Sequence, residues 1–221
     1  MNYIKINEIN VLIQKSTRAK RIALKQQRSG EIVLIVPKYC PVWMATTFAK
    51  SQKAWIVAHA THPPKQISFA PGMIVEIVGQ QLTLAQGKPS RIQDGFLYLS
   101  GDIDFFHRRT CDYAKKMLLP FIKQEVDRLT QIVKVKANHI TLRNTSSRWG
   151  SCSSSHNLSF CWKIAFAPIY VIQYLAAHEV AHLVHMNHSS AFWDLVDTLT
   201  PHRKIAEKWL KINSRDLQGI I

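Results

Sequence analysis

The sequence predicts an α+β fold in two parts, a β-rich basic part over residues 1–103 and a mixed part over residues 104–221. In the first part, apolar and polar residues alternate along several short runs, which is typical of half-buried strands. In the second part, apolar residues recur at helical spacing over longer segments, with short strands between them. No segment of linker composition separates residues 103 and 104, so the two parts are compatible with one compact unit.

The first part contains the expected strands and one expected helix. Residues 8–36 alternate in three runs and predict a three-stranded antiparallel meander. A helix is expected over residues 41–59, where Pro41 suits the first turn, and residues 61–64 then form a linker. Short hairpins follow, and the last of them is expected to turn at Asp94-Gly95.

The second part alternates helical and strand patterns. A long helix is expected from Asp104 to about Val133, and Pro120 should kink it or divide it. A strand is expected over residues 139–143, followed by two strands that join around residues 153–157. The chain should end in a basic amphipathic helix over residues 201–217.

Positive charge is in large excess. The chain has 29 Lys and Arg against 14 Asp and Glu, for a net charge of +15, and ten basic residues but only Glu31 as an acid lie between Lys15 and Lys65. Such a surface indicates anionic partners, namely nucleic acid, nucleotide phosphates or acidic proteins. A basic solvated face without a partner is an equally good interpretation, because no nucleic-acid-binding motif accompanies the charge.

The apolar segments are too short for a secretory signal or for the roughly 18–20 residues of a membrane span. The four cysteines show no Cys-x-x-Cys spacing, which is typical of reduced thiols rather than of disulfides. We therefore expect a soluble, cytoplasmic protein that does not bind a membrane.

The segment over residues 175–193 reads LAAHEVAHLVHMNHSSAFW and carries the most specific motif. His178 and His182 are four residues apart, so on a helix both imidazoles can face one point. The His-Glu-x-x-His pattern is typical of zinc hydrolases, in which Glu179 would take a proton from water bound to the metal. Catalytic zinc needs three protein ligands and one open position, so a third ligand is expected nearby.

His188 is the favoured third ligand. It lies six residues after His182, and a continuous helix would carry it away from the ligand face. We therefore expect the helix to end at Met186-Asn187, since Asn tolerates the left-handed conformation, and Ser189 or Ser190 to cap the next helix. This ligand spacing is that of the metzincin signature and predicts a zincin-like catalytic part, with an active-site helix beside a small antiparallel sheet.

Two other residues are weaker candidates for the third ligand. His185 falls on the ligand face if the helix continues, but it lies a further turn along and would have to reach back. Glu207 would supply a carboxylate from a following helix, as in gluzincins. Imidazole also binds iron, manganese, cobalt and nickel, so the motif favours Zn²⁺ without excluding these metals.

The motif predicts hydrolysis of a peptide bond, with Glu179 as general base and then general acid, and a protein or peptide as substrate. Charge that develops on the carbonyl oxygen needs a donor besides the metal, and His156, Arg148 and Tyr174 are the candidates. Gly150, in the segment before the helix, would permit close approach of backbone.

Two alternatives use the positive charge. The basic first part could hold a nucleoside triphosphate, which would make the protein a metal-dependent nucleotide pyrophosphatase, although the sequence has no Walker-type loop. The protein could also be a nucleic-acid-associated module with a structural metal, although structural zinc sites usually have four ligands.

Several separated motifs resemble one family of bacterial metal-dependent hydrolases, the YgjP-like metallopeptidases. The motifs are TRAKRIALKQQRSGEIVLIVPK, AKSQKAWI, APGMIVEIVGQQLTL, SSRWGSCSSSHNLSFCWKIAFAP and YLAAHEVAHLVHMNHSSAFW, and they extend over nearly the whole chain. The resemblance implies that His178, His182 and His188 are zinc ligands and that Glu179 is the catalytic acid and base. The family is similar to the SprT and Wss-type zinc proteases, which act near DNA, so a DNA-associated protease is a further alternative.

The sequence departs from the family pattern at two positions. His156 stands before Asn157 where the family usually has Gly, and Cys161 stands before Trp162 where the family usually has Asn. Neither position is an expected metal ligand, so the departures concern contacts with substrate.

Overall fold

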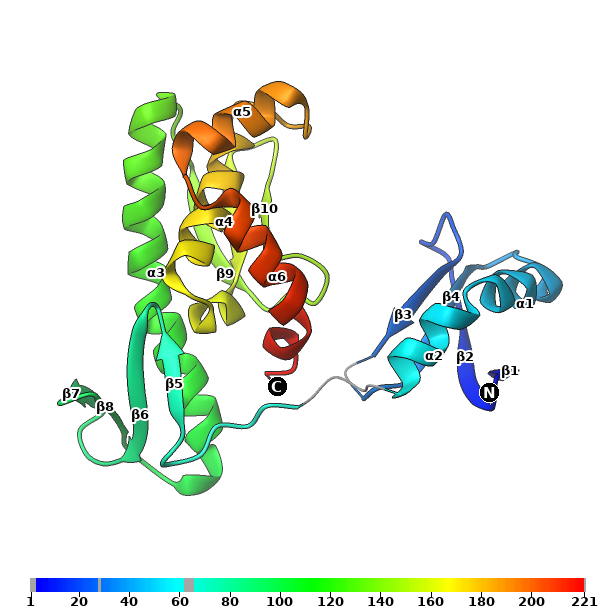
Figure 1. Cartoon of the computed structure of the whole chain (residues 1–221), viewed down its shortest axis with the longest axis horizontal. Helices are drawn as coiled ribbons and strands as arrows, with labels where there is room; N and C mark the ends of the chain where they lie inside the picture. Colours follow the sequence, from blue (N-terminus) through cyan, green and yellow to red (C-terminus); the bar gives the residue numbers. More distant parts are fainter. Residues whose placement is uncertain (1–2, 28, 62–65, 221) are drawn as a thin grey trace. The chain divides into compact units, whose positions relative to one another are not determined.

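The structure is a computed structural model that describes residues 3–27, 29–61 and 66–220. It confirms an α+β fold built from small sheets and helices (Figure 1). Contacts divide the chain into two compact units, Met1–Gln66 and Ile67–Ile221. The predicted boundary near residue 103 falls inside the second unit, because the strands of residues 74–99 share a hydrophobic core with the helices that follow them. Residues 62–64 of the predicted linker lie outside the described residues.

The first unit is a four-stranded sheet with two helices. Its strands pair in the order β1-β2-β4-β3. They are β1 (Tyr3–Ile6), β2 (Ile9–Ser16), β3 (Ala23–Gln26) and β4 (Ile32–Pro37), followed by α1 (Val42–Ser51) and α2 (Lys53–Thr61). The predicted antiparallel meander is wrong, because β2 and β4 are parallel neighbours and β3 pairs on the far side of β4. Alternation showed which residues face the core but not which strands are neighbours.

The second unit begins with a sheet in the order β5-β6-β8-β7. Its strands are β5 (Ile74–Ile77), β6 (Gln80–Gln86), β7 (Arg91–Gln93) and β8 (Phe96–Leu99). Asp94 and Gly95 both have positive φ, 50° and 77°, which confirms the turn predicted between β7 and β8. A 3₁₀ turn, η1 (Ile103–Phe105), then leads into α3 (Phe106–Val133), which remains one helix with Pro120 inside it.

A second, three-stranded sheet precedes the motif helix. Its strands pair in the order β10-β11-β9, so β10 is an edge strand. They are β9 (His139–Arg143), β10 (Gly150–Cys152) and β11 (Asn157–Cys161), and η2 (Trp162–Phe166) follows them. β10 and β11 are antiparallel as predicted, whereas β9 and β11 are parallel.

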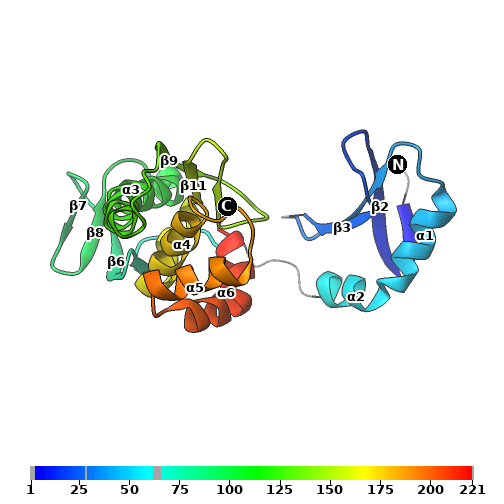
Figure 2. The ribbon, with the colours of Figure 1, turned by 90° about the horizontal axis from the view of Figure 1, so that it is seen from above.

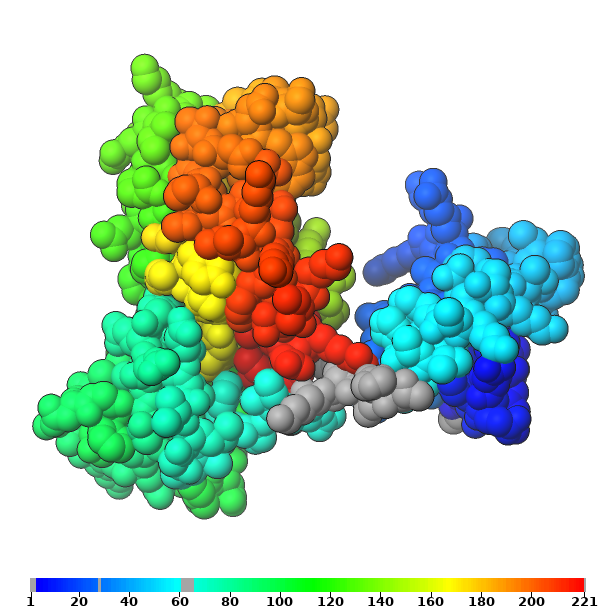
Figure 3. Space-filling model, in the orientation of Figure 1, coloured from blue at the N-terminus to red at the C-terminus, as the bar shows by residue number. Residues whose placement is uncertain are grey.

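Helix α4 (Ile169–Ala181) lies at the centre of the second unit. It packs between α3 and the pair α5 (Ser190–Leu199) and α6 (Arg203–Gln218) (Figure 2). Strand β10 contacts it as well. Figure 3 shows α5 and α6, in orange and red, at the surface of this unit. Most of α4 is buried, including Val171, Leu175 and Ala176, because the helix is apolar on nearly all sides. A polar side chain on this helix, such as that of Glu179, is therefore removed from water.

Among the described helices, none combines the length and hydropathy that crossing a bilayer would require.

Leu118 tests the assignment of the core. Its side chain is fully buried on α3, so Leu118→Ala should lower the free energy of unfolding by about 3 kcal/mol through lost burial and a cavity. Gln124→Ala, on the exposed side of the same helix, should change it by less than about 0.5 kcal/mol. Chemical denaturation monitored by circular dichroism would measure both, and equal losses would contradict the packing.

Candidate metal centre

The end of α4 positions the first two histidines of the motif. The helix ends at Ala181, about one turn before the predicted end at Met186-Asn187. The backbone closes it there, since the N–H of Leu183 donates to the carbonyl of Val180 and the N–H of His185 to the carbonyl of Ala181. The carbonyl of His185 lies 3.0 Å from Nδ1 of His182, which leaves Nε2 of His182 free to bind a ligand.

The segment after α4 brings His188 back to the helix. Ser189 caps α5 as predicted, because its Oγ accepts a hydrogen bond from the N–H of Phe192. Nε2 of His188 then lies 3.3 Å from Nε2 of His178. The ligand atoms of His178, His182 and His188 all lie within 4.8 Å of one another. The structure therefore brings together the three histidines that the sequence singled out.

This arrangement fits a divalent cation. Two imidazole nitrogens that bind one tetrahedral zinc ion at about 2.05 Å lie about 3.3 Å apart, which matches the distance between His178 and His188. Oε2 of Glu179 is buried without a protein partner, as expected of a polar group beside a bound ion or water. Three neutral imidazoles beside a carboxylate are also the donor set of many catalytic zinc sites.

Aromatic rings lie against the three histidines. The Phe192 ring lies 4.5–5.0 Å from each imidazole, between ring centroids, and Trp193 lies 5.7 Å from His178. Burial is the main cause that lowers the pKa of His178 to about 4, and it also lowers the pKa of His182. Both side chains are therefore neutral at pH 7, the form that binds metal. Both aromatic residues belong to the first turn of α5.

Glu179 is buried against the edge strand. Burial raises the pKa of its carboxyl to about 8, and the charge of Arg148 partly opposes this rise. A Cβ atom placed on Gly150 would lie 2.6 Å from Cδ of Glu179, which is too close for any side chain. The prediction that Gly150 permits close approach of backbone is confirmed, and the group it accommodates is the Glu179 carboxylate.

The predicted oxyanion donors occupy three different surroundings. Tyr174 is buried one turn before His178, and its hydroxyl donates to Oε1 of Glu207 at 3.0 Å. Arg148 is exposed just before β10, and its carbonyl accepts a hydrogen bond from Thr145. His156 lies in the turn between β10 and β11 with φ of 56°, a left-handed conformation that Gly adopts without strain.

The two weaker candidates for the third ligand lie outside the three-histidine group. Glu207 accepts the hydrogen bond that the Tyr174 hydroxyl donates. His185 contacts the ring of His182 through its backbone carbonyl and not through its imidazole. The sequence did not predict either of these contacts. It also missed the bond that Nε1 of Trp149, beside Gly150, donates to Oγ of Ser214 on α6.

Metal content tests the three-histidine group. We expect purified protein to hold about one equivalent of divalent metal by elemental analysis, and His182→Ala to lose most of it. His185→Ala is the matched control and should retain the metal, because the carbonyl that meets His182 belongs to the backbone. Loss of metal in the control alone would contradict the assignment.

A double-mutant cycle tests the contact between Gly150 and Glu179. Gly150→Ala should lower the free energy of unfolding by about 1–3 kcal/mol, because the new methyl group overlaps the carboxylate. In a Glu179→Ala background the same change should cost less, since the overlapping atoms are gone, with a coupling of at least about 1 kcal/mol. Denaturation in the presence of a chelator would keep metal affinity out of the comparison. Additive effects of the two changes on the free energy of unfolding would show that Gly150 and the Glu179 side chain are not in close contact.

Comparison with a family model agrees with the motif. A family model described as "YgjP-like, metallopeptidase domain" matches residues 20–213. The chain is also similar to the crystal structure of the metallopeptidase zymogen of Pyrococcus abyssi abylysin, with 17% identity and a TM-score of 0.38 over 45% of this chain and 99% of that chain. No curated protein matches the sequence. Since the family model extends over most of its length, the chain belongs to the YgjP-like metallopeptidase family, whose members are metal-dependent peptidases.

Proposed function

We propose that the protein is a zinc metallopeptidase in which His178, His182 and His188 hold the ion and Glu179 transfers the proton. The convergence of three imidazoles within 4.8 Å is the observation that carries this proposal. It fits family membership, which establishes a metal-dependent peptidase in general. Beyond family membership, the proposal specifies Zn²⁺ as the metal, cleavage within polypeptide chains and Glu179 as the group that transfers the proton.

The chemistry divides between the ion and the carboxylate. A zinc ion supplies Lewis acidity, which makes water a stronger nucleophile and polarises a carbonyl group. Glu179 accepts a proton as water attacks the peptide carbonyl and later delivers it to the leaving amine. A positive charge nearby would lower its pKa from about 8 toward neutrality, where a carboxyl can both accept and return a proton.

The edge strand β10 provides a place for the substrate. Among the described strands β11 is its one sheet neighbour, so its other edge lacks a strand partner and suits an extended peptide. Gly150 brings this strand against Glu179, and a peptide paired with β10 would pass close to the carboxylate. The fold thus supports binding of an unfolded or extended segment rather than of a compact surface.

Arg148 is the best placed of the three candidate oxyanion donors. Its exposed charge lies near enough to Glu179 to influence the pKa of that residue. Tyr174 would first have to give up its bond to Glu207. The sequence-based alternatives, a nucleotide pyrophosphatase and a DNA-associated protease, stay predictions.

Glu179→Gln is the direct test. It should retain zinc but lower the rate of cleavage of an unfolded, fluorescently labelled protein by at least about a hundredfold, because the amide cannot accept the proton. Asp127→Asn, an exposed change on α3, is the control and should keep wild-type activity. Full cleavage by Glu179→Gln would refute its role, and release of phosphate from nucleoside triphosphates by a zinc-loaded protein that cleaves no polypeptide would refute peptidase function.

A further inference from the structure

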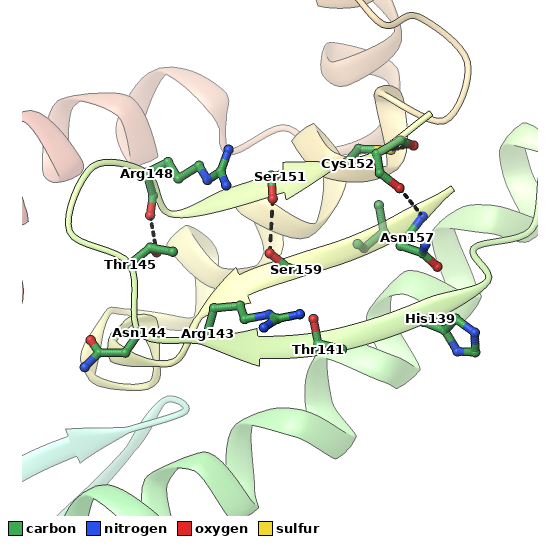
Figure 4. A pocket seen from close by; sticks show the side chains of 12 residues that line it. His139, Thr141, Arg143, Asn144, Thr145, Arg148, Ser151, Cys152, Asn157 and Ser159 are labelled. Carbon is green, nitrogen blue, oxygen red and sulfur yellow. Dashed lines mark hydrogen bonds between the residues drawn. The ribbon is translucent and has the colours of Figure 1, made fainter. Parts of the chain in front are cut away.

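The sheet of β9, β10 and β11 has an open polar face. Along β10, Gly150 and Cys152 pair with the buried residues Phe160 and Leu158 on the core side, so Ser151 points to the other side. There a row of hydroxyl residues crosses the three strands, with Ser151 and Ser159 3.1 Å apart between their Oγ atoms and Thr141 next in register (Figure 4).

This face forms a cleft of about 760 Å³ whose charged lining is entirely basic. Arg143 and Arg148 line it together with His139, and none of its lining residues is acidic. In Figure 4 the side chain of Arg148 extends beside β10 toward Ser151, and that of Arg143 lies over β9 toward Thr141. Within the described residues, neither arginine forms a salt bridge.

The basic surface continues into a neighbouring cleft of about 410 Å³. The two clefts share Arg143 and Asn144, and the second adds Arg108 and Lys115 without any acidic lining residue. Lys115 is already paired with Asp112 at 2.8 Å, so Arg143 is the central uncompensated charge of the surface. The surface therefore favours a ligand that carries negative charge.

The position of the cleft identifies the kind of ligand. A peptide that pairs with the free edge of β10 would send alternate side chains over the face of Ser151 and Arg148. Arg guanidinium groups bind carboxylates through paired, charge-assisted hydrogen bonds, and Ser and Thr hydroxyls can add further donors. The larger cleft has no Phe, Tyr or Trp in its lining, whereas single-stranded nucleic acid is usually held by aromatic stacking.

We propose that this cleft binds acidic side chains of the substrate polypeptide and selects Asp or Glu at alternate positions beside the cleaved bond. The inference rests on the proposed peptidase function and adds a substrate class to it. Arg148 is the specificity-determining residue beside β10, and Arg143, on β9 at the opposite edge of the sheet from Gly150, adds positive charge to the cleft.

Binding can be tested without turnover. In a Glu179→Gln background, a labelled peptide with Glu at every second position should bind at least about tenfold more tightly than its Gln counterpart by fluorescence anisotropy. Adding Arg143→Gln and Arg148→Gln should remove this preference. Adding Lys123→Gln and Lys208→Gln removes the same charge from exposed positions outside both clefts and should leave the preference intact.

The cleavage pattern provides the second measurement. Mass spectrometry of an unfolded protein mixture digested by the wild type should show Asp and Glu enriched at alternating positions, and Arg143→Gln alone should reduce that enrichment while cleavage continues. Cleavage without acidic preference, or a preference that only the control double variant loses, would overturn the proposal. If the acidic peptide binds tightly but the wild type cleaves no polypeptide, the peptidase function is refuted, whereas the proposal that the cleft binds acidic side chains stands. Stronger binding of single-stranded DNA than of the acidic peptide, lost in the Arg143 and Arg148 variant, would assign the cleft to nucleic acid instead.

Discussion

The centre depends on the point at which α4 ends. If the helix continued past Ala181, His188 would lie away from the face that His178 and His182 share. The early end frees the carbonyl of His185 to meet the ring of His182, and the same turn directs the chain back so that His188 reaches 3.3 Å from His178. The backbone conformation at the end of α4 thus orients the imidazole of His182 and brings that of His188 to the site.

The surroundings of α4 then set the chemistry. An almost fully apolar helix carries Glu179 into the interior, and burial raises the pKa of its carboxyl while it lowers that of His178. The two shifts have opposite directions because burial disfavours the charged form of each group. Gly150 allows the edge strand to lie against this carboxylate, so the strand available to substrate and the proton carrier are neighbours.

Much of this centre could be predicted from spacing alone. The four-residue interval between His178 and His182, the need for a third ligand and the cap at Ser189 follow from helix geometry, and the structure shows the three histidines together. Asn187 is a strong local signal and predicts an end of α4 a turn too late, whereas backbone hydrogen bonds from Leu183 and His185 close the helix earlier. Strand neighbours in the first unit, the contact of Phe192 with the imidazoles and the polar sheet face depend on contacts between distant segments, which periodicity does not encode.

The bond between Trp149 and Ser214 has a consequence for the order of assembly. Ser214 lies on the final helix, 65 residues after Trp149, and Lys163 is likewise held by the carbonyl of Gln218. A growing polypeptide on the ribosome lacks both anchors until residues 214–218 have emerged. The strand beside Glu179 therefore gains this anchor only after α6 has been synthesised, so maturation of the centre has to wait for that helix.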